Sequence, residues 1–399
     1  MSRNTDIFVS GGGIAGLTAA LTLSRLGLSV TLADPSPPPD DAEADGSDLR
    51  STAFLQPARD LLEDAGLWDQ LAPHATPLET LSVIDCTGDP PAPRTERAFR
   101  SSDLGAPAFG WNLPNWLTRK LLTEALAARP DTDLRLGTGF KSVLTREREA
   151  IVTLSDGERL RARLAIAADG RASPLREALG IKTTIARYGQ KALAFTVTHD
   201  APHNNVSTEL YLSGGAFTLV PLPDHHGQPA SAVVWMNDGP DALRLLDMGT
   251  TAFSQAATTR SCGVLGNLTL ASPRRMWPVV TQRAMRLTAE RSAIIAEAAH
   301  VLPPIGAQGL NTSLHDVSAL VDLARDTPEE IGERGWLDRF ARRRERDIRA
   351  RAGVIDLYNR VCRSDAPPVQ ALRSLGLSAV HDVAPLRKGI MRAGLGGRG

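Results

Sequence analysis

The sequence is poor in cysteine and has no excess of either charge. Its three cysteines, Cys86, Cys262 and Cys362, lie far apart in 399 residues and none belongs to a CxxC pair, so neither a disulfide framework nor a metal site is indicated. Lys plus Arg and Asp plus Glu number 45 each, which argues against a nucleic-acid-binding protein with an overall basic field. A reducing compartment is the simplest interpretation of the isolated cysteines.

Long hydrophobic runs are also missing. The uncharged stretch from Ile7 to Ser24 contains four glycines and only Arg3 before it, which is a poor pattern for a signal peptide. No other uncharged run approaches the roughly 20 apolar residues that a membrane-spanning helix needs. We therefore expect a cytoplasmic protein that is at most peripheral to the inner membrane.

The chain length and the order of its patterns predict more than one domain. At about 150 residues per domain, 399 residues correspond to two or three. Residues 6–33 read as strand, glycine turn, helix to about Leu26 and strand, which is the opening of a βαβ unit. Strand-like runs between 191 and 237, separated by Gly, Pro and His turns, predict an inserted antiparallel sheet. Further helices are expected at 56–65, 114–128 and 310–324, and a buried strand at 292–300.

The turn GGGIAG at 11–16 predicts dinucleotide binding. Gly11, Gly13 and Gly16 form GxGxxG between a strand and a helix, with Ala15 in the same turn. The first glycine allows the tight turn, the second lets the backbone approach a pyrophosphate, and the third packs the helix on the strand. Asp34 follows Gly16 by 18 residues, where a carboxylate can accept a ribose hydroxyl. An ordinary glycine-rich turn is the alternative, and the fingerprint alone does not separate NAD from FAD.

Three later segments decide between the two dinucleotides. Together with GGGIAG, the sequences DLRSTAF at 48–54, IAADGRASPLREALGI at 166–181 and AEAAHVLPPIGAQGLN at 296–311 occur in the order of a known family. The chain resembles the flavin-dependent aromatic hydroxylases typified by para-hydroxybenzoate hydroxylase, and within them the UbiH-like branch of ubiquinone biosynthesis.

The resemblance implies an α/β plus α+β fold. A Rossmann-like FAD-binding domain of the glutathione-reductase type would carry an inserted antiparallel-sheet substrate domain and a C-terminal helical segment. The expected boundaries are 1–80, 108–185 and 288–330 for the FAD-binding domain, 81–107 and 186–287 for the substrate domain, and 331–399 for a basic helical region.

The same resemblance implies flavin contacts for four polar residues. Arg50, Asn115, Arg119 and Asp169 match family positions near the cofactor, although Arg50 by itself would read as a solvated loop arginine. Asp169 belongs to an Asp-Gly turn that the family uses for flavin and pyridine nucleotide. Arg176, seven residues further, is expected to pair with Asp169 or to meet the pyrophosphate of the reductant.

The segment 296–311 resembles the family's GDAAH motif, in which the aspartate binds the ribityl chain. Glu297 stands where the family has that aspartate, and it keeps the charge with one more methylene. Proline and glycine then lead into a helix whose N-terminus would face the flavin and favour negative charge on the reduced ring. The residues expected there are Gly306, Gln308, Gly309, Leu310 and Asn311, while His300 is interpreted as a structural histidine.

The function that the resemblance implies is hydroxylation of an aromatic ring. Bound FAD, reduced by NADH or NADPH that docks transiently, would react with O2 to a C4a-hydroperoxide, and a polyprenyl phenol on the route to ubiquinone would take up the oxygen. No general base is nominated. The alternatives are a hydroxylase of a small soluble phenol, with a closed polar pocket and a carboxylate-binding arginine, and a non-catalytic flavoprotein subunit of a biosynthetic complex. A halogenase is disfavoured because no tryptophan-rich signature is present.

The C-terminal 62 residues are basic. Residues 338–399 hold 14 Lys or Arg and 6 Asp or Glu, and 338–361 reads as a long helix. A polyprenylated substrate is insoluble, so the asymmetry suggests contact with a membrane or with a partner that presents the lipid. A packed helix with a solvated arginine face is the alternative.

Overall fold

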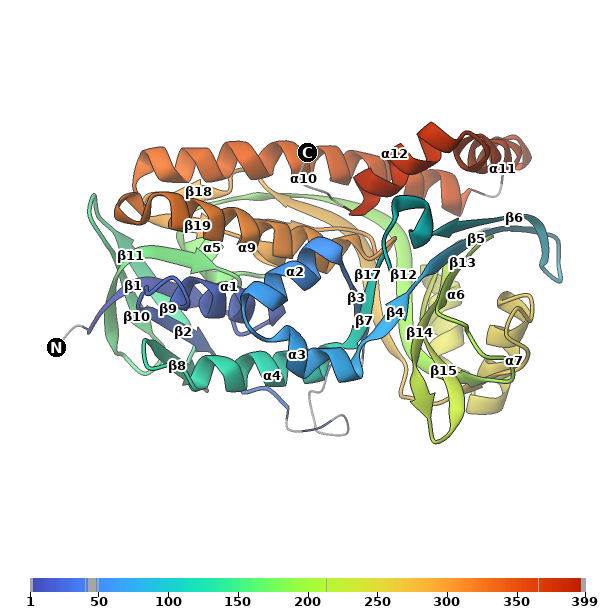
Figure 1. The fold of residues 1–399 in the computed structure, drawn as a ribbon, viewed down its shortest axis with the longest axis horizontal. Helices are drawn as coiled ribbons and strands as arrows, with labels where there is room; N and C mark the ends of the chain where they lie inside the picture. The colour runs from blue at the N-terminus through green and yellow to red at the C-terminus, as the bar shows by residue number, and fades with distance from the viewer. Residues whose placement is uncertain are drawn as a thin grey trace.

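A computed structural model describes residues 3–39, 41, 48, 50–212, 214–364 and 366–395, without the side chains of 367, 371 and 372. Two large sheets lie at opposite ends of an elongated molecule, and helices run between them (Figure 1). None of the described helices is long and apolar enough to cross a membrane.

The first sheet has eight strands in the order β18, β19, β11, β1, β2, β8, with β10 and β9 continuing from β11. Its central strands are parallel, because β1 pairs in that way with β11 and with β2. The helix α1 between β1 and β2 completes the predicted βαβ opening, although it ends at Ser24 and not at Leu26. The bounds are β1 Arg3–Ser10, α1 Ile14–Ser24, β2 Val30–Asp34, β8 Thr132–Leu136, β9 Phe140–Thr145, β10 Ala150–Leu154, β11 Arg159–Ala167, β18 Thr288–Ala289 and β19 Ser292–Ile294.

The second sheet has nine strands in the order β20, β17, β12, β15, β14, β13, β5, β6, with β16 beside β12. It is antiparallel as predicted, except that β13 runs parallel to β5. Helices α6 and α7 pack on one face of this sheet and enclose a second core. The bounds are β5 Thr80–Thr87, β6 Ala92–Arg100, β12 Thr183–His199, β13 Val206–Leu212, β14 Gly215–His225, β15 Gln228–Asp238, α6 Gly239–Asp247, α7 Thr250–Arg260, β16 Leu268–Leu270, β17 Arg275–Ala284 and β20 His300–Val301.

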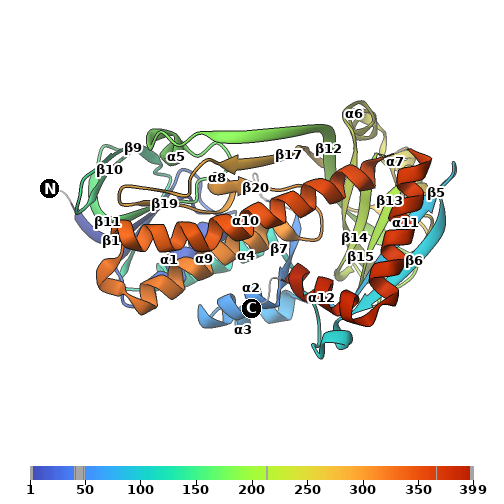
Figure 2. The ribbon, with the colours of Figure 1, turned by 90° about the horizontal axis from the view of Figure 1, so that it is seen from above.

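A three-stranded sheet of β3, β7 and β4 and the remaining helices join the two ends. The long helix α10 runs over α9 and reaches the second sheet, where α11 and α12 follow it (Figure 2). The bounds are β3 Ser51–Leu55, α2 Gln56–Asp64, α3 Trp68–Leu71, β4 Thr76–Leu78, β7 Gly110–Pro114, α4 Asn115–Ala127, α5 Pro174–Ala178, α8 Ala296–Ala299, α9 Gln308–Asp326, α10 Arg334–Arg363, α11 Pro367–Asp382 and α12 Ala384–Leu395.

The predicted strand at 292–300 is wrong in its second half. Strand β19 ends at Ile294, and Ala296 has a φ of +55° that turns the chain into the single helical turn α8. The apolar run SAIIAEAA fits either a buried strand or a buried helix, so hydrophobic pattern alone could not locate this break.

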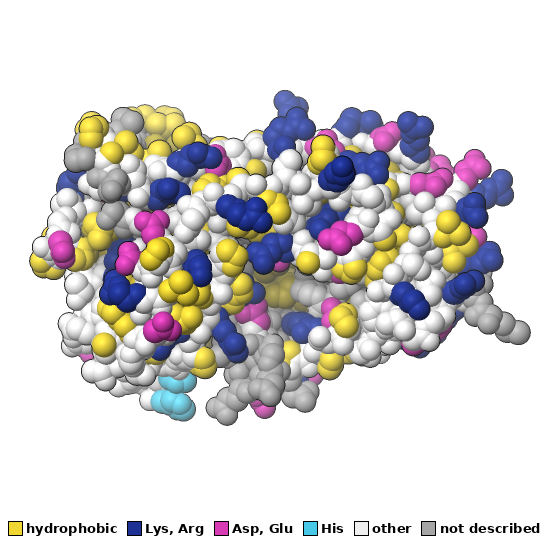
Figure 3. Space-filling view, turned by 180° about the vertical axis from the view of Figure 1, so that it is seen from behind, with side chains coloured by type: hydrophobic (Ala, Val, Ile, Leu, Met, Phe, Trp, Pro, Cys, Tyr) yellow, Lys and Arg dark blue, Asp and Glu magenta, His cyan; other side chains and the backbone are white. Residues whose placement is uncertain are grey.

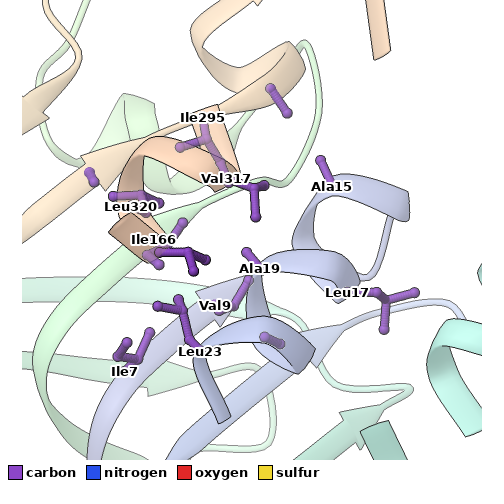
Figure 4. Packing of buried hydrophobic residues seen from close by; sticks show 14 of the residues in the cluster. Ile7, Val9, Ala15, Leu17, Ala19, Leu23, Ile166, Ile295, Val317 and Leu320 are labelled. Atoms are coloured by element: carbon purple, nitrogen blue, oxygen red, sulfur yellow. The ribbon is translucent and has the colours of Figure 1, made fainter. Parts of the chain in front are cut away.

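The main core lies between the first sheet and the helices that cover it. Ile7 and Val9 of β1 and Ile166 of β11 meet Leu320 of α9, and all four are completely buried (Figure 4). Alanine at several α1 positions, Ala19 among them, lets this helix pack closely on the sheet. The close packing leaves little freedom in where the N-terminus of α1 points.

A buried ion-pair network joins the C-terminal half to this core. Asp316 of α9 is 1% exposed; it accepts hydrogen bonds from His300 Nε2 and Arg344 Nε, both at 2.7 Å, and from the Ala296 backbone at 3.0 Å. Burial acts to raise the pKa of Asp316, but the charges and hydrogen bonds of His300 and Arg344 lower it from 3.8 to about 2. One carboxylate thus holds α8, α9 and α10 together.

We expect Asp316→Ala to lower the free energy of unfolding by about 3–5 kcal/mol, because it leaves the Arg344 charge buried without its main partner. Urea denaturation at neutral pH measures this. Because the folded-state pKa is depressed, the contribution is present above about pH 4 and is lost as the pH falls toward 2. The control is Asp322→Ala on the same helix, because its partner Arg343 is half exposed and the variant should lose at most about 1 kcal/mol of unfolding free energy. An equal loss of unfolding free energy in both variants would contradict the role of Asp316.

Candidate active site

A single continuous cavity of about 1670 Å³ extends from the glycine turn to the second sheet. Sites for one small molecule usually measure about 300–1000 Å³, so this cavity has room for more than one ligand. The face of the molecule seen from behind is hollowed near its middle, and hydrophobic side chains lie in the hollow (Figure 3). The cavity lining includes every predicted site residue except Gly16 and Asn311.

The glycine turn forms one end of the cavity. Gly11 has a φ of +111°, and a Cβ on Gly16 would collide with the carbonyl oxygen of Gly11. A Cβ on Gly13 would meet nothing within 4 Å, although Gly13 is the N-cap of α1 and lines the cavity. No side chain caps this helix, so its first backbone N–H groups face the open space. Gly11 and Gly16 are therefore needed for the fold, whereas Gly13 borders open space at the N-terminus of the helix.

Asp34 is fixed beside this turn at the end of β2. Its carboxylate accepts the Gly12 backbone N–H at 2.6 Å and the Ser36 backbone N–H at 2.8 Å. Arg119 of α4 lies 3.6 Å from the carboxylate and donates its Nε–H to the Gly12 carbonyl at 2.7 Å. Arg119 thus supports the turn from the side, while the carboxylate of Asp34 lines the cavity.

Arg50 is held in a bidentate pair with Asp48. Its Nε and Nη2 donate to the two carboxylate oxygens at 2.7 and 2.8 Å, and its guanidinium lies 4.7 Å from the ring centre of Trp277. Asn115 donates to the same carboxylate at 2.9 Å. Burial acts to raise the pKa of Asp48, but the bonds from Arg50 and Asn115 lower it overall. The alternative of a free loop arginine does not describe Arg50, because its side chain, although 45% exposed, is ordered against an acid and an indole.

Asp169 lies at the other side of the turn, after β11. It accepts hydrogen bonds from Ser10, Ser173 and the Leu175 backbone, and burial raises the pKa of its carboxyl. The expected pair with Arg176 is not formed. Arg176 is 4% exposed and donates to the carbonyl oxygens of Arg171 and Ala298, so it braces α5 against α8.

The segment after β19 forms the middle of the cavity wall. Ala296 takes the left-handed conformation at the position where the resembled motif has glycine, and the next residue, Glu297, lines the cavity. Burial acts to lower the pKa of Arg50, but Asp48, with a further contribution from the negative charge of Glu297, raises it overall. Two segments about 250 residues apart therefore present opposite charges to the same part of the cavity.

The loop before α9 forms the far end of this wall. Gly306 and Ala307 both have positive φ angles, +59° and +55°, and the helix begins at Gln308 without a side-chain cap. The side chain of Asn311 points elsewhere than expected: it bonds the Ala53 carbonyl at 2.7 Å and the Leu55 N–H at 2.9 Å. Asn311 therefore ties α9 to β3, and of the first N–H groups of the helix that of Gln308 bonds the Ile305 carbonyl at 3.4 Å.

Sequence reasoning missed the polar groups on the second sheet. Glu209 and Tyr211 of β13 and Tyr358 of α10 all line the cavity. Alternation along β13 places Ser207, Glu209 and Tyr211 on the cavity face, a signal that the sequence carries but that does not tell which face borders a site.

Two arginines also line this part of the cavity, Arg275 of β17 and Arg373 of α11, and Arg373 is paired. Arg373 of α11 donates to Asp85 at 2.6 Å and to the Cys362 carbonyl at 3.0 Å. Arg94 donates to the same carboxylate from the other side at 3.0 Å. Arg373 is therefore held in place by Asp85, and because Arg94 shares the same carboxylate the three groups keep a net positive charge.

Comparison with known proteins agrees with this geometry. The FAD binding domain family matches residues 4–352. The ubiquinone hydroxylase UbiL of Rhodospirillum rubrum is 30% identical over 98% of this chain and 89% of its own, and the 3-demethoxyubiquinol 3-hydroxylase of Escherichia coli is 26% identical over 99% of both chains.

Solved structures show the same fold. The p-nitrophenol 4-monooxygenase PnpA of Pseudomonas putida superimposes over the whole of both chains with a TM-score of 0.81 at 17% identity. PqsL of Pseudomonas aeruginosa, described as a probable FAD-dependent monooxygenase, covers 97% of this chain with a TM-score of 0.74 at 20% identity. The chain belongs to the FAD binding domain family and is an FAD-dependent aromatic-ring monooxygenase.

Proposed function

We propose that this chain hydroxylates the ring of a polyprenylated phenol in ubiquinone biosynthesis, with NADH or NADPH as reductant and O2 as the oxygen source. The observation that carries the proposal is the continuity of the cavity. It joins a dinucleotide-type turn at Gly13 to a largely apolar chamber, whose lining includes Val83, Phe99, Val220, Leu377 and Met391. Two relatives of nearly equal length bear names of ubiquinone-pathway hydroxylases.

The residues of the cavity wall fit FAD. The N-terminus of α1 would hold the pyrophosphate, and the Asp34 carboxylate would accept the ribose hydroxyl. Arg50, with Asp48 and Asn115, would lie beside the middle of the cofactor, where Glu297 replaces the aspartate of the resembled motif. Asp169 would border the pyrophosphate from the β11 side.

The flavin ring would lie at the loop before α9. The N–H groups of Gly309 and Leu310 and the positive end of the helix would favour the negative charge of the reduced ring, whereas the N–H groups of Gln308 and Gly306 bond the Ile305 carbonyl and Glu209. Bound FAD supplies the redox and oxygen chemistry, and the protein excludes water, orients the phenol and holds the charges.

The largely apolar lining of the chamber supports an apolar substrate over the alternative of a small acidic phenol. A phenol carboxylate needs a cation: Arg373 is engaged by Asp85, and Arg275, which also lines the cavity, is the residue on which the small-phenol alternative draws. The idle-subunit alternative draws on Glu297, because one more methylene shifts the carboxylate by about 1.5 Å. Turnover separates these possibilities.

The purified protein with FAD should oxidise NADH or NADPH faster when a phenol with a short prenyl chain is present, and the hydroxylated product should account for the extra consumption. Absorbance at the nicotinamide band measures the rate of NADH or NADPH oxidation, and mass spectrometry measures the amount of hydroxylated product. A matched phenol carboxylate without the prenyl chain is the control. Equal rates with both phenols would favour the small-phenol hydroxylase, and a flavin that no phenol and no nicotinamide reduces would favour the idle subunit.

Gly13→Ala should fold normally but bind FAD at least tenfold more weakly. The Cβ has free space in the protein and would occupy the space that the pyrophosphate needs. Gly16→Ala should instead lower the thermal stability, because its Cβ collides with the Gly11 carbonyl. Melting curves of the FAD-free proteins and fluorescence titration with FAD measure both. Wild-type FAD affinity in Gly13→Ala would contradict the placement of the pyrophosphate.

We also propose that α12 contacts an anionic membrane surface. Leu386 and Ile390 are 44% and 45% exposed, Lys388 and Arg392 belong to the same helix, and Ile390 and Met391 also line the cavity. Apolar and basic side chains on one helix suit a surface with anionic lipid headgroups. A lipid substrate would then reach the cavity beside the contact.

Leu386→Glu should reduce flotation with phosphatidylglycerol vesicles several-fold, because it removes apolar contact and adds repulsion. Leu243→Glu on α6, with a side chain of matched exposure at 45%, is the control and should float like the wild type. Equal flotation of all three proteins would remove α12 from membrane contact.

A further inference from the structure

Glu209 is a buried carboxyl group on the cavity face of β13. Its residue is 7% exposed, and the cavity lining contains Ser207, Glu209 and Tyr211 but neither Thr208 nor Leu210. Leu210 packs into the core on the other face of the sheet. The strand therefore directs a carboxyl group into a chamber whose nearby sheet lining, such as Ala194, Val220 and Val234, is mostly apolar.

The partners of Glu209 are neutral groups. Tyr211 donates its hydroxyl hydrogen to Oε2 of Glu209, and the backbone N–H of Gly306 also bonds the carboxyl group. The ring of Tyr358 lies edge-on to Tyr211 with 5.5 Å between centroids. None of the ion pairs formed by the described residues includes Glu209, whereas Asp34, Asp48 and Asp85 in the same cavity each face an arginine.

A buried carboxyl group without a cation is favoured in its neutral form. Burial raises the pKa of Glu209, although the bonds from Tyr211 and Gly306 act in the opposite direction. A protonated carboxyl group has one O–H donor besides its acceptor lone pairs, of which Tyr211 and the Gly306 N–H each use one. Glu209 thus keeps hydrogen-bonding capacity for another molecule in the cavity.

The position of Glu209 relates the second sheet to the expected flavin ring. Gly306 belongs to the loop before α9, so the carboxyl group lies where β13 meets the loop that would border the ring. A phenol whose hydroxyl group bonds Glu209 would have its ring next to this loop, and its prenyl chain would extend along the apolar lining. Fixing one substituent restricts which ring carbon faces the flavin.

We propose that Glu209 is the residue that positions the substrate, by a hydrogen bond between its carboxyl group and the ring hydroxyl group. The inference rests on the proposed function and adds a selection rule to it: aromatic rings that lack an oxygen substituent at this position are bound poorly. A site built to bond a hydroxyl group rejects analogues without one, because its own polar group then stays unpaired.

The test compares two ligands on the FAD-loaded protein. One is a phenol with a short prenyl chain, and the other carries a methyl group in place of the hydroxyl group. Binding is followed by the change in flavin absorbance, so no turnover is needed. The wild type should bind the phenol about tenfold more tightly than the methyl analogue, the worth of one hydrogen bond.

Glu209→Leu should abolish this preference, and Glu209→Gln, whose amide can accept from Tyr211 and donate to the ligand, should keep most of it. Thr208→Val, a buried polar residue on the opposite face of β13, is the matched control and should behave like the wild type. The ratio of the two affinities within one protein is insensitive to a general loss of folded material. The same variants should differ in the ring position of the product, with mixed products for Glu209→Leu.

The outcomes distinguish failure of the proposed function from failure of the role of Glu209. A wild type that binds FAD but neither ligand would overturn the proposed function, and the inference about Glu209 with it. A wild type that prefers the phenol, together with Glu209→Leu that keeps the same preference and the same single product, would overturn only the inference about Glu209.

Discussion

The cavity wall depends on the buried carboxylate of Asp316. Helix α8 carries Glu297, α9 begins after the loop around Gly306, and α10 contributes Tyr358 to the chamber. Asp316 belongs to α9 and bonds Ala296 of α8, His300 of β20 and Arg344 of α10. The residue is paired on both oxygens, so its burial is compensated and the arrangement is well determined. A site assembled from segments so far apart in sequence needs such a junction, because hydrophobic packing alone sets position less precisely than directional bonds to a charge.

The two ends of the cavity use the same physical device. At each end a helix begins without a side-chain cap, after a turn that requires positive φ angles at Gly11 or at Gly306 and Ala307. The free N–H groups and the helix dipole then favour negative charge on whatever occupies the space. FAD suits both places: its pyrophosphate matches the N-terminus of α1, and its flavin ring, which becomes negatively charged on reduction, matches the N-terminus of α9. The apolar chamber beyond it matches a substrate that is largely hydrocarbon.

Local signals in the sequence predicted the first end well. The spacing of Gly11, Gly13 and Gly16 between a strand and a helix, and Asp34 at the end of the next strand, describe a unit that is contiguous in sequence. The second end was predicted by resemblance, since nothing local distinguishes the PPIGAQGLN loop from an ordinary turn.

What local patterns could not predict depends on contacts across the chain. The left-handed turn at Ala296 is supported by Asp316, the guanidinium of Arg50 lies over Trp277, and Asn311 bonds β3. Glu209 lies on strand β13, both faces of which are buried. The sequence pattern therefore does not tell which face borders the cavity, and only the positions of α10 and of the loop at Gly306 in the structure show this. The domain boundaries between the sheets stay a prediction.

The central claim is that one FAD molecule spans the cavity from the glycine turn to the loop before α9. A crystal structure of the protein with FAD tests it most directly. The account predicts phosphate oxygens within hydrogen-bonding distance of the first backbone N–H groups of α1 and the pyrimidine edge of the flavin next to residues 306–310. Density for FAD that contacts only one of these segments, or that lies outside the cavity, would contradict it.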